Sequence, residues 1–501
     1  MEKKRYNVLF IQVDQWGEKF LNFTGNDKIM TPTINQLARD GVTYSNCYST
    51  CPVCIPARRS LMTGLFPKAH GDRVYSDRMK MPSVTTLAEA FHQAGYHTMA
   101  VGKLHVYPQR NRIGFQDVIL QEEGRYEFGG PDDYQIWLGE NGYIGQEFLH
   151  GMGNNTYYTR TWPLGENAHP TTWATGQMVK QIKRRDPEKP AFFYLSYTFP
   201  HPPLVPLSEY WNMYSDQDIQ EPEYGDWEDE SFIFKELMEA ARYYSHKEMI
   251  RAKKAYYAQC THIDHQIRLV IGALKEEGIL DDTILVFTSD HGEMLFDHGM
   301  VGKRTFYENS AHIPLIFSGK PIVDIRGRID DRIACLEDIM PTLLDLCNIQ
   351  VPDTVEGRSL FEKERRDFLY GEISEGYRAT RMIRMENYKL IYYPYGNKIQ
   401  IFDILQDKNE LHDLSDKDEF KNVKEEMLIR LCSSLYGKDR EEWIKNGKLV
   451  GLETPDYKER GDYTLSNQRG LHWPISRKKD WLSLKFSLFS LLFMKSYCYL
   501  Y

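Results

Sequence analysis

Four short apolar segments, separated by helical patterns, restrict the folds that this chain can adopt. The apolar segments are residues 8–13, 98–101, 191–197 and 284–288. The helical patterns are residues 33–40, 84–94, 246–277 and 336–346. A strand that is apolar on both sides is buried on both faces, so the alternation predicts an α/β fold with a large, mostly parallel central sheet flanked by helices.

The alternation of apolar segments and helical patterns stops near residue 370. Two short strands around an Asn turn are expected between Met382 and Tyr393, followed by a strand at 399–403 and a helix at 424–436. These elements predict a smaller C-terminal α+β domain with an antiparallel sheet. The predicted division of the chain is a core of residues 1–370, a small domain of residues 371–480 and an apolar tail of residues 481–501.

The two ends of the chain predict neither export nor a membrane span. The apolar stretch after the charged N-terminus covers only residues 8–11, whereas a signal peptide needs about 7–15 apolar residues. Lys485 and Lys495 bound about nine apolar residues of the tail, and a spanning helix needs about 20. We expect a cytoplasmic protein with reduced thiols. The tail is expected to dock as a helix or strand, with a membrane-surface or partner contact, or an unpacked tail, as alternatives.

The net charge of −9, from 62 basic and 71 acidic residues, provides no overall positive field. This argues against nucleic acid as a partner and means that an anionic substrate must be held by local charges. Residues 205–245 are rich in Asp, Glu, Tyr and Trp and show little periodicity. We expect an insertion over the core that could rim the site, with rings that either stack a sugar or simply pack.

Polar residues follow each of the four apolar segments. They are Asp14 and Gln15, then Lys103 and His105, then His201, and finally Asp290 and His291. A single strand-end Asp is commonly a helix cap, but four such endings converge at one edge of a parallel sheet. The oxygens of Asp14, Gln15 and Asp290, with a His291 nitrogen, suit Ca²⁺ or Mg²⁺ better than structural zinc.

The strongest local signal is the segment from Cys51 to Gly64, which has three interpretations. Cys51 and Cys54 have the C-x-x-C spacing of a thiol redox site. A zinc knuckle would need a second such pair, which the sequence lacks. In the third interpretation Cys54 is a nucleophile at a helix start, Arg58 clamps an anion, and Gly64 ends the helix.

The segment Cys54-Ile55-Pro56-Ala57-Arg58, continuing to Leu61, Thr63 and Gly64, resembles the sulfatase signature C-x-P-x-R followed by L-x-T-G. Further segments similar to that family are residues 7–15, 95–105, 288–308, 338–344 and 388–393. The resemblance covers roughly residues 6–415. It implies an alkaline-phosphatase-like fold with one divalent cation, usually Ca²⁺, with Mg²⁺ or Mn²⁺ as alternatives.

In this family a separate maturation enzyme oxidises the signature cysteine to formylglycine (3-oxoalanine), and Cys54 matches that position. One hydroxyl of the hydrated aldehyde would attack sulfur, and the alcohol or phenol would leave. The second hydroxyl would then expel sulfate and restore the aldehyde. The resemblance therefore implies a sulfuric ester hydrolase that cleaves a small sulfated sugar or aryl sulfate.

The resemblance also implies roles for other residues. Arg58 matches the residue that holds the formylglycine hydroxyl. Lys103 and His105 match groups that contact formylglycine and sulfate. His201 and Lys303 match groups at the sulfate and the leaving oxygen, which makes His201 the general-acid candidate.

The metal ligands implied by the resemblance are Asp14, Gln15, Cys54, Asp290 and His291. Many relatives carry a second Asp at the position of Gln15, Asn at that of His291 and Ser at that of Ala57. The Gln and His forms occur in a branch that includes phosphonate monoester hydrolases. A phosphonate monoester or phosphodiester hydrolase of the same fold is therefore the alternative, and a non-enzymatic anion-binding protein is the third hypothesis.

Overall fold

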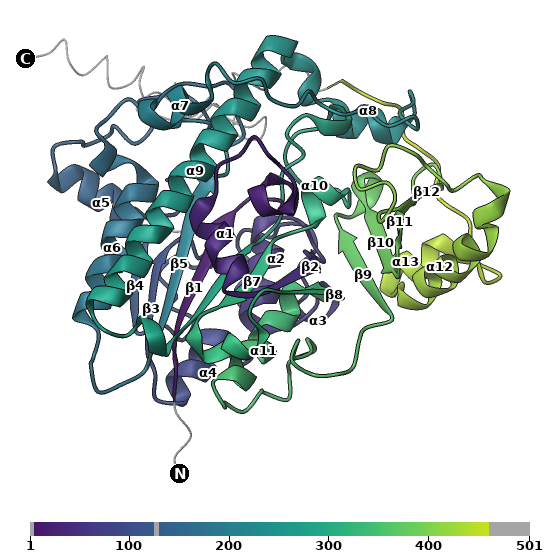
Figure 1. Ribbon diagram of the computed structural model, residues 1–501. Coiled ribbons are helices and arrows are strands. Elements are labelled where there is room, and N and C mark those ends of the chain that lie inside the picture. The colour runs from purple at the N-terminus through teal and green to yellow at the C-terminus, as the bar shows by residue number, and fades with distance from the viewer. Residues whose placement is uncertain (1–4, 125–129, 460–501) are drawn as a thin grey trace, which may run out of the picture.

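The computed structural model describes residues 5–124 and 130–459, and its centre is an eight-stranded sheet (Figure 1). The strand order is β4-β3-β5-β1-β6-β7-β2-β8, and only β7 runs antiparallel to its neighbours. The predicted α/β fold with a mostly parallel sheet is confirmed. The strands are β1 Asn7–Asp14, β2 Gly41–Tyr48, β3 His97–Gly102, β4 Asp117–Leu120, β5 Ala191–Pro200, β6 Thr283–Ser289, β7 Leu315–Ser318 and β8 Arg328–Cys335.

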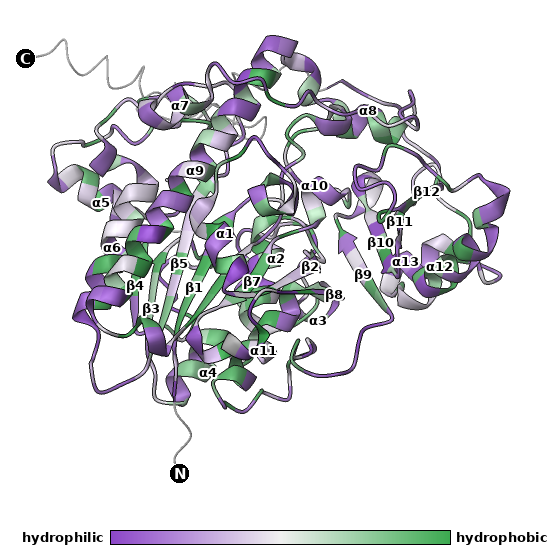
Figure 2. Ribbon diagram, in the orientation of Figure 1, coloured by the Kyte–Doolittle hydropathy of each residue, from purple (hydrophilic) through white to green (hydrophobic). Residues whose placement is uncertain are grey.

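Helices cover both faces of this sheet. Successive side chains of β1 point to opposite sides, and since they are apolar, each face needs a layer of helices to bury them. Leu9 and Ile11 join an apolar cluster with α1, α6 and α9, whereas Val8 and Phe10 join the cluster formed with α2, α4 and α11 (Figure 1). Figure 2 shows that hydrophobic residues are concentrated in the central strands, while the surrounding helices mix both kinds. The helices of this part are α1 Pro32–Arg39, α2 Cys54–Thr63, α3 Pro67–His70, α4 Leu87–Gln93, α5 Asp133–Glu140, α6 Pro170–Arg184, α7 Ser208–Tyr214, α8 Phe232–Met238, α9 His246–Glu276, α10 Glu308–Ala311 and α11 Ile339–Leu346.

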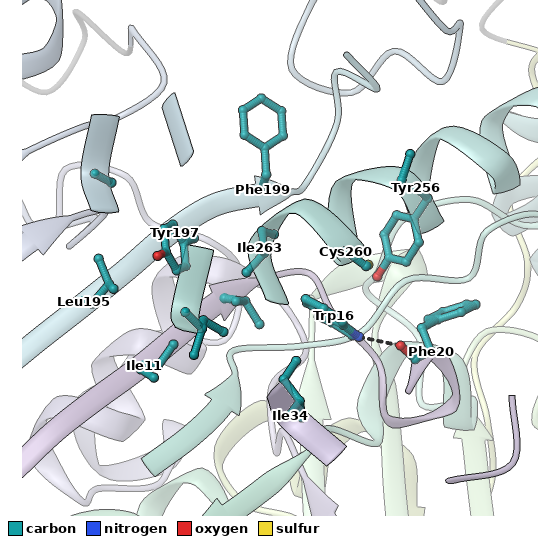
Figure 3. Close-up of a cluster of buried hydrophobic side chains, with 14 of the residues drawn as sticks. Ile11, Trp16, Phe20, Ile34, Leu195, Tyr197, Phe199, Tyr256, Cys260 and Ile263 are labelled. Atoms are coloured by element: carbon teal, nitrogen blue, oxygen red, sulfur yellow. Dashed lines mark hydrogen bonds between the residues drawn. The ribbon is translucent and has the colours of Figure 1, made fainter. Parts of the chain in front are cut away.

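The carboxyl end of β1 is locked by aromatic packing against α9 (Figure 3). Trp16, two residues after β1, is fully buried, and its indole Nε1 donates to the carbonyl of Phe20 at 2.8 Å. The ring of Tyr256 from α9 meets that of Phe20 edge-on, 5.1 Å between centroids. Its hydroxyl donates to the backbone oxygen of Gln15 at 2.6 Å. The residues that follow β1 are thus held rigidly at the sheet edge.

A separate four-stranded antiparallel sheet lies beside the large one, in the order β12-β11-β10-β9 (Figure 1). It confirms the expected α+β part with an antiparallel sheet, and the turn between β10 and β11 contains Asn387, as the sequence predicts. The division of the chain at residue 371 stays a prediction. The elements are β9 Phe368–Ile373, β10 Thr380–Met385, β11 Tyr388–Tyr393, β12 Lys398–Asp403, α12 Lys421–Ser434, α13 Gly437–Trp443, β13 Ile444–Lys445 and β14 Lys448–Leu449.

Buried charges join the small sheet to the larger part. Lys389 of β11 has a fully buried side chain, and its Nζ lies 2.6 Å from Glu308 Oε1 of α10 and 2.7 Å from Glu410 Oε1. Glu410 also accepts a hydrogen bond from the backbone nitrogen of Glu308 at 2.6 Å. Since a buried ammonium needs its counter-charges, this contact ties the position of β11 to that of α10.

Two predicted segments differ from the structure in detail. The helix expected at residues 84–94 begins only at Leu87, because Thr86 caps it by accepting from the Glu89 nitrogen. Residues 205–245 contain α7 and α8 rather than an aperiodic insertion. In that segment the Trp227 ring stacks on Tyr307 at 5.0 Å and donates to the Glu410 carbonyl, so this ring serves packing.

The predicted apolar tail, residues 481–501, lies outside the described residues. Within the described part of the chain, no helix combines the length and the apolar character required to cross a bilayer.

Candidate active site

Adjacent strands bring the predicted polar residues to one edge of the sheet. β3, β5, β1 and β6 are neighbours and run parallel, so their carboxyl ends lie side by side. Lys103, His201 and Asp290 follow three of these strands, and Asp14 ends the fourth. All four side chains are buried. Residues far apart in sequence therefore share one small volume.

Cys54 is the first residue of α2, which points its N-terminus at this edge. The helix ends at Gly64, whose φ of 66° and hydrogen bond to the Ser60 carbonyl form the left-handed cap expected from the sequence. The Cys54 side chain is 1% exposed, and its Sγ lies 3.2 Å from His291 Nε2. Cys51 belongs to a neighbouring apolar cluster, and both cysteines are free thiols.

Arg58, one turn after Cys54, ties the two acidic strand ends together. Its Nη2 lies 3.0 Å from Asp14 Oδ2 and its Nε lies 2.9 Å from Asp290 Oδ2. Its Nη1 donates to the Lys103 carbonyl at 2.8 Å and to Ser196 Oγ at 2.9 Å. The guanidinium thus fixes β1, β3, β5 and β6 relative to α2, which no point charge could do.

Four side chains form a candidate cation site. The ligand atoms of Asp14, Cys54, Asp290 and His291 all lie within 4.8 Å of one another, and each residue is buried. His291 Nδ1 lies 3.0 Å from the Gly292 carbonyl, so it carries the proton and leaves Nε2 as a ligand. Two carboxylates with one imidazole fit a divalent cation.

Gln15 is oriented by a glutamate that sequence reasoning missed. Gln15 has a φ of 68°, and its Oε1 accepts from Lys303 Nζ at 2.5 Å. Its Nε2 donates to Glu293 Oε2, which also accepts from the Tyr157 hydroxyl at 2.6 Å. The other oxygen of Glu293 accepts from the backbone nitrogens of Leu295 and Gly302, both at 2.7 Å. The amide oxygen of Gln15 is therefore held toward Lys303.

Lys103 and Lys303 supply positive charge near Cys54, and His201 lies beside Lys303. Lys103 Nζ lies 2.7 Å from Asp14 Oδ2 and 3.0 Å from Glu123 Oε1. Lys303 Nζ donates to His201 Nε2 at 2.7 Å, while His201 Nδ1 donates to the Pro202 carbonyl at 2.7 Å. His201 Nδ1 also lies 3.6 Å from Glu123 Oε1, so Glu123 and His201 link the two lysines into one group.

His105 stands in a constrained loop held by a second glutamate that the sequence did not single out. Its φ is 59°, in the left-handed region that is unfavourable for a side chain. Glu122 Oε1 accepts from the backbone nitrogens of Leu104 at 2.8 Å and His105 at 2.9 Å. Burial raises the pKa of the Glu122 carboxyl to about 7, although these hydrogen bonds and the Lys103 charge lower it. In the sequence, only the position of Glu122 two residues after β4 indicates that its carboxylate could hold the loop that carries His105.

The charges at the site favour an anion at Cys54. Burial alone would raise the pKa of the Cys54 thiol, but Lys303, Lys103, His291 and a hydrogen bond from His105 together lower that pKa well below its usual value. Such surroundings stabilise negative charge on a buried nucleophile and on an anionic substrate beside it.

Comparisons with known proteins agree with this geometry. A family model described as Sulfatase matches residues 6–349, and one described as N-sulphoglucosamine sulphohydrolase, C-terminal, matches residues 296–435. The chain is 37% identical over 467 residues to an arylsulfatase of Clostridium perfringens, covering 89% of this chain and 97% of that protein.

Two solved structures share the fold. A phosphonate monoester hydrolase of Agrobacterium radiobacter superposes with a TM-score of 0.73 at 22% identity, covering 86% of this chain and 95% of that chain. A structure in complex with its substrate D-glucosamine-2-N,6-O-disulfate gives a TM-score of 0.71 at 20% identity, covering 85% and 97%.

Proposed function

The chain belongs to the sulfatase family, and on this premise we propose that it cleaves a sulfate monoester of a small sugar or aryl alcohol. The observation that carries the proposal is the setting of Cys54, a buried residue at the start of α2. The charges of Lys103 and Lys303 act on it, and it lies among candidate ligands for a divalent cation. Preorganised charge of this kind stabilises the anionic transition state of sulfate transfer.

We further propose that Cys54 is converted to formylglycine by a separate maturation enzyme, which would meet the chain in the cytoplasm. Asp14, Gln15, Asp290 and His291 would hold one divalent cation together with residue 54. Ca²⁺ is the first choice, with Mg²⁺ and Mn²⁺ as alternatives. The formylglycine would supply a hydroxyl nucleophile and the cation a Lewis acid beside the sulfate.

The remaining side chains position the sulfate and move the proton. Arg58 keeps Asp14 and Asp290 in place, and Lys103 and His105 face residue 54. His201 is the proposed general acid. Its Nδ1 proton is committed to Pro202, so a proton on Nε2, passed from Lys303 Nζ at 2.7 Å, is the one available to the leaving oxygen.

Mass spectrometry of the peptide that contains Cys54 tests the modification. Protein from its native source is expected to show a loss of about 18 Da relative to cysteine, which corresponds to replacement of CH₂SH by CHO. The Cys54→Ala variant is the matched control for the peptide assignment. An unmodified thiol in active native protein would overturn the formylglycine mechanism.

The alternative is a phosphonate monoester or phosphodiester hydrolase. It is supported by the phosphonate monoester hydrolase fold, by His291 in the candidate cation site and by Gln15, whose backbone nitrogen donates to Asp290 of that site. Parallel turnover of 4-nitrophenyl sulfate and a 4-nitrophenyl phosphonate monoester separates the two. We expect the higher kcat/KM for the sulfate, and the loss of both activities in Cys54→Ala. A much higher kcat/KM for the phosphonate ester would select the alternative.

A further inference from the structure

An exposed arginine follows the proposed sulfate-contacting Lys303 directly. The Arg304 guanidinium carbon lies 5.5 Å from the ring centre of Tyr75, so the two groups stack. The Arg304 backbone has a φ of 76°, and its nitrogen donates to the Pro52 carbonyl at 3.0 Å. Of the described residues, none forms an ion pair with Arg304. The guanidinium edge is therefore available to an outside anion.

Tyr75 connects this arginine to the active site. Its ring meets that of His105 edge-on, with 6.1 Å between centroids. His105 is 5% exposed and belongs to the group of side chains that surround Cys54. The Tyr75 ring therefore contacts both His105 of the active site and the guanidinium of Arg304.

The segment that carries Tyr75 is rigid. Asp72 is fully buried and accepts from the backbone nitrogens of Val74 and Ser76, both at 3.1 Å. Arg73 is anchored to the small sheet and to α13 through Glu372 at 2.9 Å and Asp439 at 2.7 Å. Because both flanks are fixed, the stacked pair is preorganised and binds without a large entropy loss.

We propose that Arg304 and Tyr75 form a subsite for a second anionic group, a carboxylate or a further sulfate, on the leaving group of the substrate. The inference rests on the proposed function, because it places the leaving group beside the sulfate site. A guanidinium binds both anions through two parallel N–H bonds, and the adjoining tyrosine ring offers a face to a sugar or aryl ring.

Steady-state kinetics with paired esters test the subsite. The esters are 4-nitrophenyl sulfate, its 3-carboxylated counterpart, and phenyl 1,3-disulfate, which separates a carboxylate from a second sulfate. Arg304→Ala is expected to raise KM for the dianionic esters about 10-fold or more relative to the monoanion, since a charged hydrogen bond is lost. Arg304→Lys is expected to lie between, because it keeps the charge but not the planar fork.

Arg430→Ala is the matched control. Arg430 of α12 also lies over an aromatic ring, 5.3 Å from the ring centre of Phe368, and its loss is expected to change none of the three KM values. Equal effects of Arg304→Ala on all esters, or none, would overturn the subsite. If the wild type hydrolyses none of them, the proposed function fails. The subsite is then decided by calorimetric Kd values for phenyl sulfate and 3-carboxyphenyl sulfate, in Cys54→Ala with and without Arg304→Ala. A preference of Cys54→Ala for the dianion that is lost when Arg304→Ala is added supports the subsite. The absence of such a preference in Cys54→Ala refutes it.

Discussion

Replacing Lys389 with methionine should separate the contribution of buried charge from that of apolar packing. The Nζ atom of Lys389 lies 2.6 Å from Glu308 and 2.7 Å from Glu410, and its side chain is fully buried. Methionine keeps most of the volume of the side chain but leaves two buried carboxylates without their cation. Removing one partner of a buried ion pair costs about 3–5 kcal/mol of unfolding free energy. We expect a loss of that size at pH 7.

Urea denaturation followed by circular dichroism measures this loss from the shift in midpoint and the common slope. The control is Lys320→Met, whose partner Asp281 lies 2.7 Å away with side chains 66% and 72% exposed, and which should cost less than about 1 kcal/mol. In the wild type, the charge of Lys389 lowers the pKa of Glu308. The stability that this ion pair contributes is therefore present at neutral pH and is lost as pH falls below the pKa that Glu308 has in the unfolded chain. The gap between variant and wild type should therefore narrow toward pH 4. A loss below about 1 kcal/mol at pH 7 would refute the reasoning.

Three further outcomes are expected. Glu293→Gln should weaken cation binding or activity about 10–100-fold. An amide has one acceptor oxygen, so it cannot accept both from Gln15 and Tyr157 and from the backbone nitrogens of Leu295 and Gly302. A titration of melting temperature against cation concentration measures the affinity, and an unchanged affinity and rate would contradict this role. Glu122→Gln should gain stability relative to the wild type as pH rises from about 4.5 to about 7. In this range the Glu122 carboxyl is ionised in the unfolded wild type but still protonated in the folded one, because its pKa is raised to about 7, so the wild type loses stability. Melting temperatures of both proteins at pH 5 and 8 test this, and a constant difference between them would disprove it. Adding Ca²⁺ should raise the melting temperature of the wild type, because bound ligand stabilises the folded state by about 2.7 kcal/mol at 100 times Kd. The melting temperature of Asp290→Asn should not rise. Equal shifts in the two proteins would exclude Asp290 as a ligand.

The sequence predicts the central strands of the fold best. β1, β3, β5 and β6 are buried on both faces, so their apolar runs stand out without knowledge of their neighbours. The polar residues that follow them could be identified for the same reason. The helix that begins at Cys54 and ends before Gly64 was predicted from its capping residue.

The sheet margin and the supporting carboxylates could not be predicted in the same way. β8, Arg328–Cys335, is an edge strand whose first residues are exposed and charged, and β7 has only four residues. Glu122 and Glu293 look like ordinary surface glutamates in the sequence. Their roles arise because chain segments around Leu104 and Gln15 present donors to them, and those contacts are set by tertiary structure.

The position of β1 in the middle of the sheet has a consequence for the synthesis of the chain. β1 pairs with β6, so Val13 meets Ser289 only after the intervening segment has been made. At about 5–20 residues per second that interval is roughly 15–55 s, during which an apolar strand lacks its final neighbour. The proposed modification of Cys54 would have a comparable interval, because the contact of its Sγ with His291 Nε2 cannot form before residue 291 has been made. Slower translation would lengthen both the exposure of the strand and the access to this thiol.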